Sequence, residues 1–162
     1  MHHDTTFRRR SLLAVAAAFT LPAWASTAGR GNAALPLVEV WKSPTCGCCG
    51  DWITYLQANG FRTKVNEVES AVPMRRRLGL SDKYGSCHTA LVGGYLLEGH
   101  VAAREVKRLL QEKPRGVVGI AVPGMPLGSP GMDGPVYEGK KTPHDVLLVM
   151  RDGSASVYQS YR

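Results

Sequence analysis

Hydrophobic and polar positions along the chain recur with two different periods. Residues 35–41 form a β-rich run, and residues 63–68 alternate between apolar and polar side chains as a second strand would. Between these runs, apolar residues recur at mostly helical spacing from Trp52 to Phe61, and Gly60 is a suitable helix end. The pattern therefore predicts a strand, a helix and a second strand, in that order.

The pattern continues through the middle of the chain. A short helix is expected within residues 70–80, and residues 87–97 predict two strands joined by a Gly-Gly turn. Residues 102–112 place their apolar side chains on one side of a helix, which Pro114 ends. The order β-α-β-α-β-β-α is that of a thioredoxin-like layered α/β fold with a central mixed sheet.

The composition changes after this helix. Residues 116–134 are rich in Gly and Pro and contain Pro-Gly-Met twice, so we expect a long loop without regular structure. A C-terminal hairpin is predicted from residues 146–150 and 155–158, with Asp-Gly at its turn. Residues 35–162 are thus expected to form one domain, as the length of the chain suggests.

The N-terminal segment has the composition of a secretory signal peptide. Arg8, Arg9 and Arg10 precede the uncharged apolar residues 11–22, and an Ala-x-Ala cleavage signal ends at Ala25. The apolar run is too short to span a bilayer comfortably, so we expect no stable membrane insertion after cleavage. The arginine pair also fits a twin-arginine export signal, which leaves the export route open, and an uncleaved anchor is the alternative.

Export determines the compartment and limits the partners. We expect residues 1–25 to be removed, residues 26–34 to be a flexible leader and the mature protein to be periplasmic. The chain carries a net charge of +7, but its basic residues are not interleaved with aromatic ones. The cluster of residues 75–77 is therefore expected to be a solvated helix face, and nucleic acid is not an expected partner.

All four cysteines lie in two short motifs. Three stand in the Cys-Gly-Cys-Cys run at residues 46–49, and the fourth is followed by a histidine in Cys87-His88. Two structural disulfides are the ordinary expectation for four exported cysteines. Three cysteines within four residues are too close to link distant parts of a fold, however. Thiolate and imidazole are instead ligands suited to Cu(I), zinc or iron–sulfur chemistry.

The expected position of the cysteine run suits two different functions. Cys46 precedes the first helix, and Cys48 and Cys49 fall in its first turn, where free N–H groups and the helix dipole lower thiol pKa values. The resulting thiolates could bind metal, with bridging sulfurs holding more than one Cu(I). Alternatively, Cys46 and Cys49 could be the attacking and resolving thiols of a thiol–disulfide oxidoreductase. Such an enzyme does not need Cys48, which favours a metal-binding protein over an enzyme.

Three further residues are candidate metal ligands. His100 follows the expected pair of strands, and Met125 and Met132 are thioether donors in the two Pro-Gly-Met segments. Each also has an ordinary structural explanation, as a hydrogen-bonded histidine or as packing methionines. Zinc, bound by three cysteines and a histidine or by four cysteines, is the alternative to Cu(I), and an oxidising compartment disfavours an iron–sulfur cluster.

Taken together, these motifs resemble the CopG-like family of exported metal-binding proteins found with bacterial copper-resistance systems. The resemblance rests on W-K-S-P-T-C-G-C-C at 41–49, S-C-H-T-A at 86–90, E-G-H-V at 98–101 and the Pro-Gly-Met segments. It covers about residues 36–150 and implies a thioredoxin-like fold. By this resemblance the copper-site residues are Cys46, Cys48, Cys49, Cys87 and His88, with His100 a less direct match.

The resemblance also implies a function and partners. By the resemblance, we expect an exported protein that captures or handles Cu(I) in copper tolerance, with or without redox activity. Copper ions and other periplasmic copper-handling proteins are the expected partners.

Overall fold

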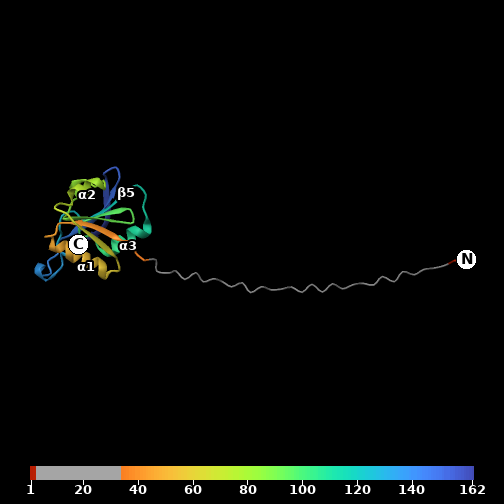
Figure 1. Cartoon of the computed structure of the whole chain (residues 1–162), viewed down its shortest axis with the longest axis horizontal. Helices are drawn as coiled ribbons and strands as arrows, with labels where there is room; N and C mark the ends of the chain where they lie inside the picture. The colour runs from red at the N-terminus through yellow and green to blue at the C-terminus, as the bar shows by residue number, and fades with distance from the viewer. Residues whose placement is uncertain (3–33) are drawn as a thin grey trace. The chain divides into compact units, whose positions relative to one another are not determined.

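A mixed seven-stranded sheet runs through the described part of the chain (Figure 1). The computed structural model describes residues 1–2 and 34–162, and residues 34–162 form one structural unit. The expected signal peptide beyond residue 2 and the expected leader up to residue 33 lie outside the described residues. Within the described part, none of the helices has the length and apolar character needed to span a membrane.

The strands lie across the sheet in the order β2-β1-β3-β4-β5-β6-β7. β1 and β2 are parallel, as are β4 and β5, and all other neighbours are antiparallel. The predicted α/β class with a central mixed sheet is confirmed. The strand bounds are β1 Val38–Lys42, β2 Thr63–Glu67, β3 His88–Val92, β4 Tyr95–Glu98, β5 Val117–Ala121, β6 His144–Met150 and β7 Ala155–Tyr161.

Among residues 34–162, three α-helices pack on the sheet. Trp52 and Leu56 of α1 and Val106 and Leu109 of α3 are fully buried in one core cluster with Val40 of β1. Their spacing of three or four residues is what puts them on one side of each helix. The helix bounds are α1 Gly47–Ala58, α2 Val72–Arg77 and α3 Ala103–Glu112, with 3-10 turns at η1 Asp82–Tyr84 and η2 Pro135–Tyr137.

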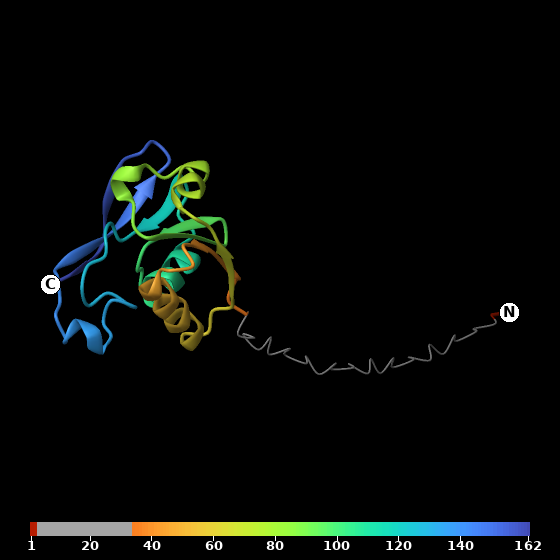
Figure 2. The same ribbon diagram turned by 60° about the vertical axis from the view of Figure 1, so that its left-hand side comes forward.

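A second core cluster lies on the other face of the sheet. Leu80 and Tyr84, which follow α2, pack there with Leu96 of β4, whereas the next residue, Leu97, belongs to the first cluster. Successive side chains of a strand point to opposite faces, so the sheet has a hydrophobic core on both sides. Figure 2 shows α2 on the opposite side of the sheet from α1 and α3.

The prediction of a structureless loop over residues 116–134 is wrong. Val117–Ala121 form β5, which is buried along its whole length between β4 and β6. A strand buried on both faces is a continuous apolar run without alternation, and the surrounding Gly and Pro residues obscured it. The irregular segment therefore begins after residue 121.

The arginines of α2 differ from the predicted solvated face in one position. Arg76 and Arg77 are exposed, but only 5% of Arg75 is accessible to solvent. Arg75 forms an ion pair with the fully buried Glu98 at the end of β4. A helix face predicted from charge alone is thus correct for two of its three residues.

The last two strands are longer than the predicted ones. β6 and β7 pair in antiparallel register and are joined by residues 151–154. The register shifts between Val146 and Leu147, which marks a bulge in the pairing. β7 forms one edge of the sheet and β2 forms the other.

Candidate metal centre

The cysteine run forms the start of α1. Cys46 is the residue before the helix and has an extended backbone (φ −80°, ψ 95°), whereas Cys48 and Cys49 lie in the first turn. This is the predicted arrangement, and it follows from the turn that ends β1 at Lys42. Cys49 is buried, and Cys46 and Cys48 are partly accessible.

Strand pairing brings the fourth cysteine to the same place. In the antiparallel register of β1 and β3, Lys42 lies opposite His88. Cys87 therefore lies beside the turn that leads into α1. Its Sγ atom is 3.5 Å from Sγ of Cys49. Motifs that are distant in the sequence thus meet at one end of the sheet, as predicted.

The four sulfur atoms form one group. Their Sγ atoms all lie within 4.8 Å of one another. Cys46 and Cys49 form a disulfide, whereas Cys48 and Cys87 are free thiols. The Cys48 sulfur lies 3.6 Å from that of Cys46, so each half of the disulfide has a free thiol beside it. The spacing of a C-x-x-C pair at a helix start allows this disulfide. The sequence alone did not decide whether the two cysteines are joined.

A second group shares one of these sulfurs. Ligand atoms of Cys87, His88 and His100 also lie within 4.8 Å of one another. The Cys87 Sγ atom is 3.4 Å from Nδ1 of His88 and 3.2 Å from Nε2 of His100. Both histidines are completely buried. Cys87 therefore belongs to a sulfur-rich group on one side and a thiol–imidazole group on the other.

The hydrogen bond of His100 determines which ring nitrogen faces Cys87 with a lone pair. Nδ1 of His100 lies 2.9 Å from the carbonyl oxygen of Pro130, which can only accept a hydrogen bond. Nδ1 must therefore carry the proton, and Nε2 presents its lone pair toward the Cys87 sulfur. Backbone carbonyls often fix the tautomer of metal-binding histidines in this way.

Both imidazoles are held in the neutral form that metals require. Burial lowers the pKa of His88 to about 3, helped by the neighbouring His100 and the Lys42 ammonium. Burial also lowers the pKa of His100. The His88 ring packs against Trp52 with centroids 4.3 Å apart, and its Nε2 atom has no hydrogen-bond partner among the described residues. A buried nitrogen without a partner is uncommon and is consistent with a ligand site.

The Cys87 thiol is protonated at neutral pH. Burial, and then the adjacent Cys48 thiol, raises the pKa of Cys87 to about 12. The S–H group can donate to the lone pair on Nε2 of His100. The expected lowering of the pKa values in the cysteine run remains a prediction, because Cys46 and Cys49 do not titrate while they are joined.

The second Pro-Gly-Met segment, residues 130–132, packs against the start of α1. A Cβ atom at Gly131 would lie 2.6 Å from the Cys48 carbonyl oxygen and 2.7 Å from the Trp52 nitrogen, and Gly131 has a φ of +83°. Only glycine permits both this conformation and this close approach. Residues 130–132 therefore pack closely against the first turn of α1, which carries the cysteines.

The two candidate methionines differ in exposure. Met132, next to Gly131, is buried and accepts a main-chain hydrogen bond from Gly128. Met125 is 53% exposed and follows Gly124, which is hydrogen-bonded to the residues just before Cys87. The residue before each methionine, Gly131 or Gly124, contacts a segment that carries the cysteines, and the role of both methionines as ligands remains a prediction.

Two charged residues beside the groups were missed in the sequence. Arg75 and Glu98 are buried within hydrogen-bonding distance of Ser86, the residue before Cys87. The available signal was a carboxylate that directly ends the apolar strand Tyr95–Glu98. A buried carboxylate is commonly paired with a cation, and the sequence could not indicate which of three arginines supplies it.

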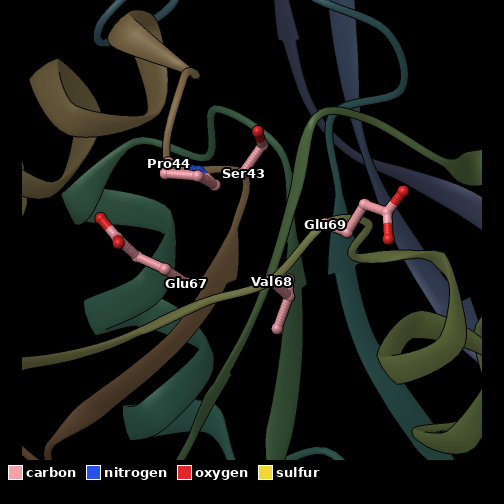
Figure 3. A pocket seen from close by; sticks show the side chains of 5 residues that line it. All are labelled: Ser43, Pro44, Glu67, Val68 and Glu69. Carbon is pink, nitrogen blue, oxygen red and sulfur yellow. The ribbon is translucent and has the colours of Figure 1, made fainter.

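The described residues also line a pocket of about 370 Å³ at the ends of β1 and β2. Its lining residues are Ser43, Pro44, Glu67, Val68 and Glu69. Figure 3 shows the Glu67 and Glu69 carboxylates pointing away from each other. None of the candidate ligands is among the residues that line this pocket.

Comparison with known proteins provides independent information. Residues 84–132 match a family model described as "Protein of unknown function, DUF411". No curated protein matches the chain. A solved structure of copper resistance protein CopG, form 2, is 38% identical, with a TM-score of 0.72 over 79% of this chain and 99% of that chain. Form 1 of the same protein is 38% identical, with a TM-score of 0.71 over 78% and 98% of the two chains.

Proposed function

The chain belongs to the family of the copper resistance protein CopG, and on this basis we propose that it captures or handles Cu(I) through its cysteine and histidine groups. One observation carries the proposal: four sulfurs from two distant motifs lie within 4.8 Å of one another, and one of them also lies beside two neutral imidazoles. Thiolates and imidazoles are the donors that Cu(I) prefers.

The proposed ligands supply three kinds of donor atom. Cys46, Cys48, Cys49 and Cys87 supply thiolates, and His88 and His100 supply imidazoles on the far side of Cys87. Met125 and Met132 are proposed as thioether donors that complete the site from the loop. Because a thiolate can bridge two metal ions, the shared Cys87 sulfur supports the binding of more than one Cu(I). Zinc, held tetrahedrally by four cysteines or by three cysteines and a histidine, is the competing metal.

The proposal extends to the location and fold of the protein. We infer that residues 1–25 are a cleaved signal peptide, residues 26–34 a flexible leader and residues 35–162 a periplasmic domain. We also infer that the domain is thioredoxin-like, which the order of β1 through α3 supports. Other periplasmic copper-handling proteins are the proposed donors and acceptors of the metal.

The test is an anaerobic titration of the reduced protein with Cu(I) against a competing chelator. Tight binding of one or several ions is expected, together with a marked loss of affinity or stoichiometry in Cys48→Ser. If Cys48→Ser binds Cu(I) as well as the unaltered protein does, the proposed role of the cysteine run is wrong. The same titration with Zn²⁺ decides between the two metals.

A second function is favoured by a specific observation, the Cys46–Cys49 disulfide at the start of α1. Thiol–disulfide oxidoreductases use such a pair, with Cys46 as nucleophile and Cys49 as resolving thiol. Against this function, the Cys87 sulfur lies 3.5 Å from Cys49 and would compete for a mixed disulfide. Insulin reduction by the metal-free protein, lost in Cys46→Ser and kept in Cys48→Ser, would favour the enzyme.

A further inference from the structure

A buried ion pair lies beside the cysteine and histidine groups. Nη2 and Nε of Arg75 lie 2.7 and 2.8 Å from Oε1 of Glu98. Both side chains are buried, Glu98 completely. Removing two charges from water is costly, and apolar replacements of a buried ion pair are often as stable as the pair itself. The pair is therefore weak evidence for stability alone, and its other contacts indicate what else it does.

Two of those contacts are made to the same residue, Ser86. Oε1 of Glu98 accepts a hydrogen bond from the Ser86 main-chain N–H at 2.7 Å, and Nη2 of Arg75 donates to the Ser86 carbonyl at 2.6 Å. Both main-chain polar groups of Ser86 are thus held by the ion pair. Hydrogen bonds to charged groups are stronger and shorter than neutral ones. The backbone is fixed directly before Cys87.

The same carboxylate is linked to the histidine side of the site. Oε2 of Glu98 accepts a hydrogen bond from Thr89 Oγ1 at 2.7 Å, one residue after His88. Glu98 is also followed by Gly99, whose N–H donates to the His88 carbonyl at 3.1 Å, and then by His100. The Glu98 side chain therefore contacts the residues on both sides of the Cys87–His88 pair. Glu98 also lies two residues before His100 in the chain.

We propose that Arg75 and Glu98 are positioning residues that hold the Ser86 backbone so that the Cys87 sulfur faces both Cys49 and His100. This inference rests on the proposed copper function and adds residues that touch no metal. The short sulfur distances, 3.5 Å to Cys49 and 3.2 Å to His100, both depend on the position of the Cys87 backbone. Geometry at a metal site depends on such outer contacts.

Arg75→Lys is the main test variant. Lysine keeps the positive charge that Glu98 needs, but a single ammonium cannot reproduce the guanidinium contacts with Glu98 and the Ser86 carbonyl together. Arg77→Lys is the matched control, because Arg77 is an exposed arginine on the same helix. Tyr95→Phe is a second control, because it removes the hydrogen bond from the Tyr95 hydroxyl to the Pro114 carbonyl at the other end of β4 from Glu98.

The first readout needs no copper. In the reduced, metal-free full-length protein, the iodoacetamide alkylation rate of Cys87 is followed by peptide mass spectrometry. Arg75→Lys is expected to speed alkylation of Cys87 by about tenfold. The loss of one charge-assisted hydrogen bond would raise the population of molecules in which the Cys87 segment has moved by about that factor. Arg77→Lys is expected to change nothing, and Tyr95→Phe is expected to lower the melting temperature without changing the Cys87 alkylation rate. A residue that only stabilises the fold would change the melting temperature alone, whereas a positioning residue would also change the alkylation rate of Cys87.

The second readout uses Cu(I) titration and the ultraviolet copper–thiolate absorption. Arg75→Lys is expected to alter the absorption and weaken Cu(I) binding by about tenfold. If Arg75→Lys does not fold, the charge-free double variant Arg75→Met with Glu98→Met replaces it, with the same expectations. A folded variant with unaltered alkylation, absorption and affinity overturns the positioning role. If the unaltered protein binds no Cu(I), the proposed function fails, and the alkylation rates still decide the positioning role.

Discussion

Nε2 of His100 lies 3.2 Å from Sγ of Cys87 and faces it with a lone pair, because Nδ1 donates its proton to the Pro130 carbonyl. A partly buried thiol and a buried neutral imidazole therefore share one hydrogen bond in the metal-free protein. A metal ion that binds here must replace the thiol proton with itself. The pairing of Cys87 and His100 thus connects copper binding to proton release.

Cu(I) affinity should rise with pH. Burial raises the pKa of Cys87 to about 12, so at any lower pH the thiol must lose a proton on binding metal. Each proton released strengthens apparent binding about tenfold per pH unit. His88, whose pKa burial lowers to about 3, is already neutral and adds no proton above that pH. Competition titrations at two pH values measure the slope, and Cys87→Ser should reduce it by one proton. An equal slope in Cys87→Ser would contradict the assignment.

Copper uptake should depend on the reduction of the protein. With the Cys46–Cys49 disulfide intact, only Cys48 and Cys87 remain as free thiols. We expect the oxidised protein to bind fewer Cu(I) ions, and more weakly, than the protein treated with a phosphine reductant. Copper and thiol analysis after desalting measures both quantities. Equal copper loading of the two forms would show that the disulfide sulfurs are not ligands.

Trp52→Phe should destabilise the protein. The Trp52 indole Nε1 donates to the Val101 carbonyl at 2.8 Å, and both residues are fully buried. Leaving that carbonyl without a donor should reduce the free energy of unfolding by about 1–3 kcal/mol. Urea denaturation measures the change, and Trp41→Phe, at a half-buried position without such a hydrogen bond, serves as the control. Equal effects of both substitutions would argue against this hydrogen bond.

Gly131→Ala should disturb the loop that orients His100. The added methyl group would meet the Cys48 carbonyl and the Trp52 backbone, at a φ that alanine rarely adopts. Because Pro130 precedes Gly131, the hydrogen bond to Nδ1 of His100 should weaken. The ¹⁵N imidazole shifts of His100 report this as a change in the Nδ1-protonated tautomer. Gly134→Ala is the control, since nothing lies near its Cβ position and its φ is −69°.

Short sequence patterns predicted those elements whose ends are set by residues close by in the sequence. The start of α1 at the cysteine run and its end before Gly60, which has a φ of +90°, both follow from neighbouring residues. β5 was missed because a strand buried on both faces has no alternation to detect. The Arg75–Glu98 pair spans 23 residues, and the His100–Pro130 hydrogen bond spans 30. Such contacts depend on the assembled sheet, and no local pattern encodes them.

The sharing of Cys87 between the two groups has a consequence for how copper would be exchanged. Its sulfur cannot be a thiol toward one group and a thiolate toward the other. Once the first ion has removed the proton, a second ion no longer has to do so, and this linkage favours binding of the second ion. Partly filled molecules should then be scarce. Under the proposed function, the protein would take up and hand over copper in sets of ions rather than one ion at a time.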